Sequence, residues 1–155
     1  MKKYFFTDVD GTLTDGRIII GNDGELAKCF NAKDGYALNE LLPQNGIIPV
    51  ILTGRQSKIV EIRADELNIT HVYQGIKDKL DFLNSFTKEH NITFQEMAFI
   101  GDDVNDLECI KACGIGGCPS DSVKEVQDAA DYISSKPGGM GAVRDFAEYV
   151  IESTK

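Results

Sequence analysis

Short apolar runs alternate with stretches of helical periodicity along most of this 155-residue sequence. The apolar runs are predicted strands at residues 4–9, 47–52, 72–73 and 97–100, with 114–116 and 132–133 as weaker candidates. Helical spacing between them predicts helices at 35–42, 57–67, 77–90, 104–112, 122–129 and 142–151. This alternation indicates the α/β class, with a doubly wound, Rossmann-like parallel sheet covered by helices on both faces.

One segment interrupts the alternation. In GRIIIGNDGELAKCF, residues 16–30, an Asn-Asp-Gly sequence separates two short runs that can form strands, which predicts a β-hairpin inserted after the first strand. The chain is long enough for one domain with a proper core and too short for two of usual size. We therefore expect a single domain over residues 1–155.

The charge of the chain limits its partners. A net charge of −9 and a pI near 4.6 argue against a general affinity for nucleic acid or for anionic membranes. An anionic ligand must therefore be held by a local cluster of positive groups. Because the sequence begins MKKYFFTDVD, without an apolar leader, and has no stretch of membrane-spanning length, we expect a cytoplasmic protein.

Polar clusters follow three of the predicted strands directly. Asp8 and Asp10 end the first strand, the Thr-Gly-Arg segment 53–55 ends the second, and the Gly-Asp-Asp segment 101–103 ends the strand at 97–100. Each cluster taken singly could be a turn or a helix cap. Parallel α/β sheets bind their ligands where strands end, so three clusters at one edge indicate a binding site.

The carboxylates of these clusters need a positive partner. Side chains alternate along a strand, so Asp8 and Asp10 project from the same side and repel each other. A neighbouring lysine, a metal ion or solvent could relieve this repulsion. GDDVND crowds Asp102, Asp103 and Asp106 together, a set of oxygen ligands that suits Mg²⁺. Lys79 falls in the first turn of a predicted helix, where the helix dipole disfavours a cation unless an anion is bound there.

These residues carry a family resemblance. DVDGTLT (8–14), the strand that ends in Thr53, Lys79 and GDDVND (101–106) resemble, in order, the four motifs of the haloacid dehalogenase superfamily, whose members are mostly Mg²⁺-dependent phosphatases. The hairpin after the first motif, YQGIKDK and KPGGMGAVRDF are similar to the small capless branch that includes 3-deoxy-D-manno-octulosonate 8-phosphate phosphatases. Neither interval in which cap domains enter has room for one.

The resemblance implies a role for each residue of the first motif and for the metal. Asp8 is the expected nucleophile, which forms an aspartyl-phosphate, and Asp10 is the expected acid and base. Mg²⁺ is expected on the Asp8 side chain, the Asp10 main-chain carbonyl and Asp102, with water completing the shell. Gly11 would let the backbone turn closely past the phosphate.

The other motifs supply phosphate contacts and support. The Thr53 hydroxyl and the Gly54 N–H are expected to bind phosphate oxygens, and Lys79 to add a fixed positive charge. Asp103 and Asp106 are expected to orient the metal waters or Lys79. A phosphorelay receiver also combines clustered aspartates, Mg²⁺, Thr and Lys, but its phosphorylated Asp ends a middle strand, where this chain has Thr53, and Asp-x-Asp-Gly-Thr is not its acidic pair. A non-catalytic binding subunit would normally have lost Asp8, Asp10 or Lys79.

Substrate and assembly follow from the capless branch. Its members act on 3-deoxy-octulosonate 8-phosphate, the expected substrate here, or on nonulosonate 9-phosphates of the sialic acid type. Arg55 could bind the carboxylate of such a sugar acid in a bidentate pair, or could form a surface ion pair instead.

An isolated hairpin is marginally stable in water, and the resemblance implies a homotetramer with a hairpin core. The Gly-rich segment 136–141 and Arg144 would reach a neighbour's site, unless Arg144 is simply an exposed residue of the last helix.

Overall fold

The computed structural model describes residues 1–155 and contains a sheet of six parallel strands in the order β5-β4-β1-β6-β7-β8. The predicted doubly wound sheet is therefore confirmed, and every predicted strand is present. The strands are β1 (Tyr4–Thr7), β4 (Ile48–Leu52), β5 (His71–Tyr73), β6 (Met97–Ile100), β7 (Ile115–Cys118) and β8 (Tyr132–Ile133).

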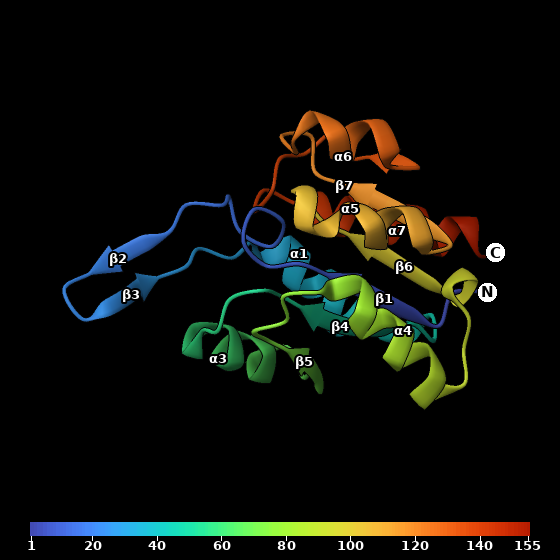
Figure 1. Cartoon of the computed structure of the whole chain (residues 1–155), viewed down its shortest axis with the longest axis horizontal. Helices are drawn as coiled ribbons and strands as arrows, with labels where there is room; N and C mark the ends of the chain where they lie inside the picture. The colour runs from blue at the N-terminus through green and yellow to red at the C-terminus, as the bar shows by residue number, and fades with distance from the viewer.

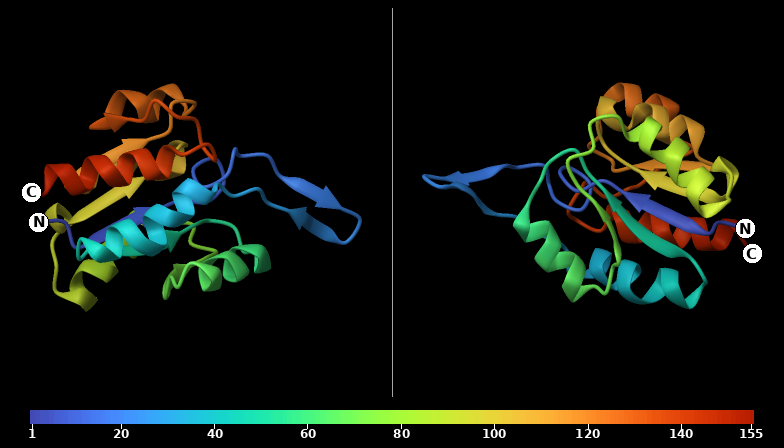
Figure 2. Two further views of the ribbon diagram at one scale, coloured as in Figure 1. Left: turned by 180° about the vertical axis from the view of Figure 1, so that it is seen from behind. Right: turned by 60° about the horizontal axis from the view of Figure 1, so that its bottom comes forward.

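Helices cover both faces of the sheet (Figures 1 and 2). One face carries α1 (Ala32–Tyr36), the π-helical turn η1 (Ala37–Leu41), α2 (Leu42–Gln44), α3 (Lys58–Glu66) and α7 (Ala142–Ser153). The other face carries α4 (Lys79–His90), α5 (Leu107–Ala112) and α6 (Lys124–Ala129). Short 3₁₀ turns, η2 (Phe94–Glu96) and η3 (Val104–Asp106), precede β6 and α5.

Three predicted helix starts are shifted by two or three residues, including that of α6, which begins at Lys124 instead of residue 122, and capping explains the other two. The helix predicted from residue 35 begins at Ala32, because the Asn31 side chain accepts the N–H of Lys33 at 2.9 Å. The helix predicted from residue 77 begins at Lys79, because Asp78 accepts the N–H of Asp81 at 2.9 Å. The second cap makes Lys79 the first residue of α4.

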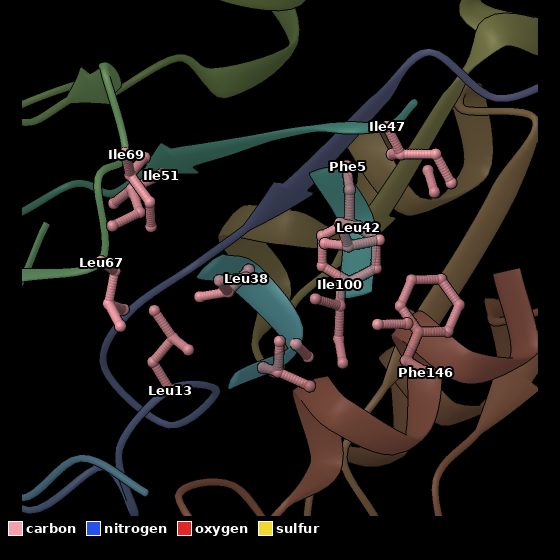
Figure 3. Packing of buried hydrophobic residues seen from close by; sticks show 14 of the residues in the cluster. Phe5, Leu13, Leu38, Leu42, Ile47, Ile51, Leu67, Ile69, Ile100 and Phe146 are labelled. Atoms are coloured by element: carbon pink, nitrogen blue, oxygen red, sulfur yellow. The ribbon is translucent and has the colours of Figure 1, made fainter. Parts of the chain in front are cut away.

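The core lies in two layers, one on each side of the sheet. A cluster of 19 buried residues packs between the sheet and α1, α3 and α7, and Figure 3 shows much of it. A second cluster of 13 residues packs under α4, α5 and α6. Phe5 joins the first cluster, whereas Tyr4 and Phe6 join the second, as the two-residue period of a strand requires. Burial on both faces fixes β1 in the middle of the sheet.

The predicted hairpin is also present. β2 (Ile19–Gly21) and β3 (Gly24–Ala27) form a separate antiparallel pair that projects from the domain (Figures 1 and 2). Its apolar side chains are largely exposed, including Ile18, Ile20 and Leu26. None of the helices in this fold is both long enough and apolar enough to cross a bilayer.

A buried carboxylate caps the last helix from a distance. Asp34 in α1 accepts the N–H of Arg144 at 2.9 Å, and Gly141, at the start of α7, has no side chain that could cap. Burial raises the pKa of Asp34. This contact joins two helices that are more than a hundred residues apart in the sequence.

We expect Asp34→Ala to lower the free energy of unfolding by about 1–3 kcal/mol, because α7 loses its cap and its buried N–H groups lose an acceptor. Asp34→Asn should cost less, since its amide oxygen can still accept. Urea unfolding measures both changes. Asp65→Ala, on the exposed face of α3, is the control and should change stability by less than about 0.5 kcal/mol. Equal losses at the two positions would contradict the capping role.

Candidate active site

The three predicted polar clusters meet at one edge of the sheet. β4 and β6 flank β1, and Thr7 is level with Ile51 on one side and with Ile100 on the other. The residues that follow these strands therefore lie together, where the strand order reverses. This is the edge at which the sequence places the site.

A polar cleft of about 190 Å³ opens there. None of its lining residues is hydrophobic. The sequence predicts all of them except Asn105, which stands inside GDDVND and has no signal of its own. They are Asp8, Asp10, Thr53, Gly54, Arg55, Asp102, Asp103 and Asn105.

Lys79 lies beneath this cleft with a side chain that is 0% exposed. Its Nζ donates to Asp8 Oδ1 at 2.9 Å and to Asp106 Oδ1 at 2.7 Å. A buried ammonium group is tolerated only when it is paired, and the two carboxylates also offset its position at a helix N-terminus. The structure therefore fixes Lys79 against the expected nucleophile.

Three carboxylates gather around Lys79. Oxygens of Asp8, Asp102 and Asp106 lie within 4.8 Å of one another. Asp106 is fully engaged, because Oδ1 accepts from Lys79 and Oδ2 accepts the N–H groups of Asp102 and Asp103 at 3.1 and 3.4 Å. Asp8 and Asp102 each keep one oxygen that accepts no hydrogen bond from the protein.

The electrostatics of the cluster leave negative charge uncompensated. Burial raises the pKa of Asp8 to about 6, although Lys79 opposes the shift. Burial and the neighbouring Asp106 raise the pKa of Asp102 to about 6, and burial and Asp8 do the same for Asp106. Unengaged carboxylate oxygens in a crowded, acidic site are ligands that fit Mg²⁺. Asp8 and Asp102 would hold the ion, while Asp106 is already taken up by Lys79 and two backbone donors.

Gly11 sets how closely the loop after β1 approaches Asp102. Its φ is +89°, and a Cβ at this position would overlap the Asp102 carboxylate. Only glycine satisfies both conditions. The Thr12 hydroxyl then donates to Asp102 Oδ1 at 3.2 Å.

The Gly-rich segment 136–141 packs against its own chain. Gly138 and Gly139 pack on the 11–15 loop of their own chain: a Cβ at Gly138 would overlap the Gly11 carbonyl, and the Gly139 N–H donates to the Thr12 carbonyl at 3.1 Å. These glycines support the chain's own site because their lack of side chains allows this close packing.

The Asp10 carboxylate has a different cationic partner from that of Asp8. Lys28, which follows β3, donates to Asp10 Oδ1 at 2.5 Å. The Arg55 Nε lies 3.8 Å from Asp10 Oδ2, and the Arg55 side chain is 49% exposed at the mouth of the cleft. No local pattern marks Lys28, because only the folded hairpin brings it to Asp10.

Two predicted residues lie at the margin. Asp103 accepts the N–H of Val104 at 2.7 Å, and so caps η3 while it lines the cleft. Arg144 is outside the cleft, where it donates to Glu148 and lies 5.2 Å above the Tyr36 ring.

Comparisons with known proteins agree with this geometry. The sequence profile of the haloacid dehalogenase-like hydrolases matches residues 57–144. The 3-deoxy-D-manno-octulosonate 8-phosphate phosphatase of Escherichia coli K12 is 38% identical over 144 residues, which are 93% of this chain and 76% of the relative.

Solved structures extend the match to the whole fold. The phosphatase of the same name from Moraxella catarrhalis, in complex with a magnesium ion, a phosphate ion and a KDO molecule, superposes with a TM-score of 0.93 at 41% identity, over 98% of this chain and 87% of that one. The cobalt-bound enzyme from Haemophilus influenzae gives 0.92 at 33% identity, over 98% and 88%.

Proposed function

The chain belongs to the family of haloacid dehalogenase-like hydrolases, and from this premise we propose that it is a Mg²⁺-dependent phosphatase of 3-deoxy-D-manno-octulosonate 8-phosphate. The observation that carries the proposal is the buried Asp8 side chain, bound by Lys79 at the edge of an entirely polar cleft, with Asp10 two residues away. The similar enzymes, one of them solved with magnesium, phosphate and KDO, supply the substrate class.

The residues divide the reaction into two displacements. A carboxylate oxygen of Asp8 bonds to phosphorus as the ester bond breaks, and Asp10 gives a proton to the departing sugar oxygen. Water then attacks the aspartyl-phosphate and gives its proton to Asp10, which restores both carboxyl groups. Mg²⁺, when bound, neutralises charge on Asp8 and on the phosphoryl oxygens.

The remaining cleft residues bind the phosphoryl group in this proposal. Thr53 and Gly54 line the same cleft as Asp8, and the Thr53 hydroxyl and the Gly54 N–H would donate to phosphoryl oxygens. Lys79 keeps its charge beside the nucleophile throughout. Asp102 would hold the metal with Asp8 and, as the resemblance implies, with the Asp10 carbonyl, and Asp106 keeps Lys79 in place.

Phosphate release from a panel of phosphorylated sugars and sugar acids tests the substrate. We expect the highest kcat/KM with 3-deoxy-D-manno-octulosonate 8-phosphate, and no turnover after the metal is removed with EDTA. A higher kcat/KM with a nonulosonate 9-phosphate would identify that ester as the substrate instead. Turnover confined to neutral sugar phosphates would contradict a sugar acid substrate altogether.

Arg55 is the residue that we expect to bind the substrate carboxylate. It is half-exposed, and its distances to Asp10 and Glu25 are 3.8 and 4.0 Å, too long for hydrogen bonds that would hold it in place. Arg55→Ala should raise KM for the sugar acid phosphate by about tenfold to a hundredfold, the worth of hydrogen bonds to a charged group. Activity on p-nitrophenyl phosphate, which has no carboxylate, should change by less than about threefold. Equal losses of activity on both esters would mean that Arg55 binds the phosphate group or stabilises the fold instead.

We further propose that the protein is a cytoplasmic homotetramer, and the exposed hairpin supports the assembly. Ile18, Ile20 and Leu26 expose apolar surface on an element that is marginal alone, and a second copy of the hairpin would cover it. Arg144 would then contribute to the active site of a neighbouring subunit, since it does not reach the cleft of its own chain.

Sedimentation should give the mass of a tetramer. Mixed tetramers of Asp8→Asn and Arg144→Ala chains should recover activity that neither parent has, and a monomer at micromolar concentration would contradict both points.

A further inference from the structure

Lys28 is a buried lysine that the proposed reaction does not use. Its side chain is 2% exposed, and its ammonium group lies 2.5 Å from Asp10 Oδ1 and 3.7 Å from a carboxylate oxygen of Glu25. Burial of a lysine is unfavourable unless its charge is paired, so this ammonium group is confined to the two carboxylates. Lys28 comes from the end of the hairpin, whereas Asp10 comes from the loop after β1.

The hairpin is fixed at this point by a second contact. Glu25 accepts a hydrogen bond from the Ser57 hydroxyl at 2.6 Å, and Ser57 is the N-cap of α3. Glu25 therefore ties β3 to the start of α3 and holds the Lys28 ammonium group from its other side. Lys28 reaches Asp10 from an anchored position.

From this geometry we infer that Lys28 is the positioning residue of the acid and base Asp10, an inference that rests on the proposed function. Lys28 engages Oδ1, whereas Oδ2 accepts no hydrogen bond from the protein and is the oxygen left for a ligand. Arg55 cannot do this, because it is half-exposed and 3.8 Å from Asp10. Lys28 therefore stays with Asp10, while Arg55 is free to turn to a ligand.

The inference assigns the proton transfer to one atom. In the first step a bond forms between Asp8 and phosphorus, the ester bond breaks, and its electron pair goes to the sugar oxygen, which takes the proton from Asp10 Oδ2. In the second step water gives a proton to the same oxygen as it bonds to phosphorus, and the bond to Asp8 breaks. Lys28 donates to Oδ1 in both steps and keeps its own protons.

The test compares esters that need the proton with esters that do not. An alkyl oxygen leaves poorly without a proton, whereas p-nitrophenol leaves as a stable anion. In single-turnover experiments, Lys28→Met should slow release of the sugar acid by about 10-fold to 100-fold and release of p-nitrophenol by less than about threefold. Lys28→Arg, which keeps a donor for Oδ1, should recover most of the lost rate. Lys124→Met, an exposed lysine on α6, is the matched control and should equal the parent.

Two further measurements separate positioning from a structural role. The increase in melting temperature caused by Mg²⁺ should be unchanged in Lys28→Met, because the Asp10 side chain is not a metal ligand. A crystal structure of the variant should show the Asp10 carboxylate displaced. Equal slowing of both esters, or an Asp10 carboxylate in the parent position, would overturn the role of Lys28. Absence of turnover by the parent protein would count against the proposed function alone, since the crystallographic result does not depend on it.

Discussion

The Asp8→Asn variant should lose at least about 10⁴-fold in kcat, the scale on which removal of a catalytic nucleophile acts. An amide cannot form the aspartyl-phosphate, and it also removes one of the two unengaged carboxylate oxygens that would hold Mg²⁺. Phosphate release from the sugar acid phosphate measures the loss. Asp128→Asn, on the exposed side of α6, should retain full activity.

Stability separates this loss from a failure to fold. The Asp102 carboxylate repels the Asp8 carboxylate, and replacing Asp8 by Asn removes this repulsion. Lys79 remains paired with Asp106 in the variant. Without metal the variant should therefore be at least as stable as the parent, while the rise in melting temperature on adding Mg²⁺ should be lost. Substantial turnover in Asp8→Asn, or a full response to Mg²⁺, would remove Asp8 from both roles.

The sequence predicts the edge of the sheet and most of the cleft for a local reason. A buried strand is a continuous apolar run, so the residue at which the run ends is visible, and Asp8, Thr53 and Asp102 follow such ends. Parallel pairing then brings them together without further information. Helix starts are less well predicted, because the caps Asn31 and Asp78 also look like ordinary loop residues.

Contacts between distant elements could not be predicted in this way. Lys28 meets Asp10 only after the hairpin is anchored through Glu25 and Ser57. Asp34 caps a helix that begins more than a hundred residues later. Both are single charged residues outside the motifs, and their roles depend on contacts with elements that only the folded chain brings together.

Lys79→Met should be both inactive and markedly less stable. Methionine has a similar length but no charge, so Asp8 and Asp106 would stay buried with no cation between them. Breaking a buried ion pair by removing one partner costs about 3–5 kcal/mol, and we expect the free energy of unfolding in EDTA to fall by this amount. Urea unfolding of the two proteins at one pH measures the difference. A variant as stable as the parent would mean that the carboxylates are relieved by water and that Lys79 is not the centre of the cluster.

A double variant tests whether unpaired charge is the cause. Removing the second partner of a buried pair relieves the penalty left by the first, so Lys79→Met combined with Asp106→Asn should be more stable than Lys79→Met alone. The amide introduced by Asp106→Asn would retain an oxygen for the N–H groups of Asp102 and Asp103, which now donate to Asp106 Oδ2. Activity should stay lost in both variants, because the positive charge beside Asp8 is absent from each. Recovery of stability without activity would separate the two tasks of Lys79, whereas a further loss of stability would show that Asp106 supports the fold independently of Lys79.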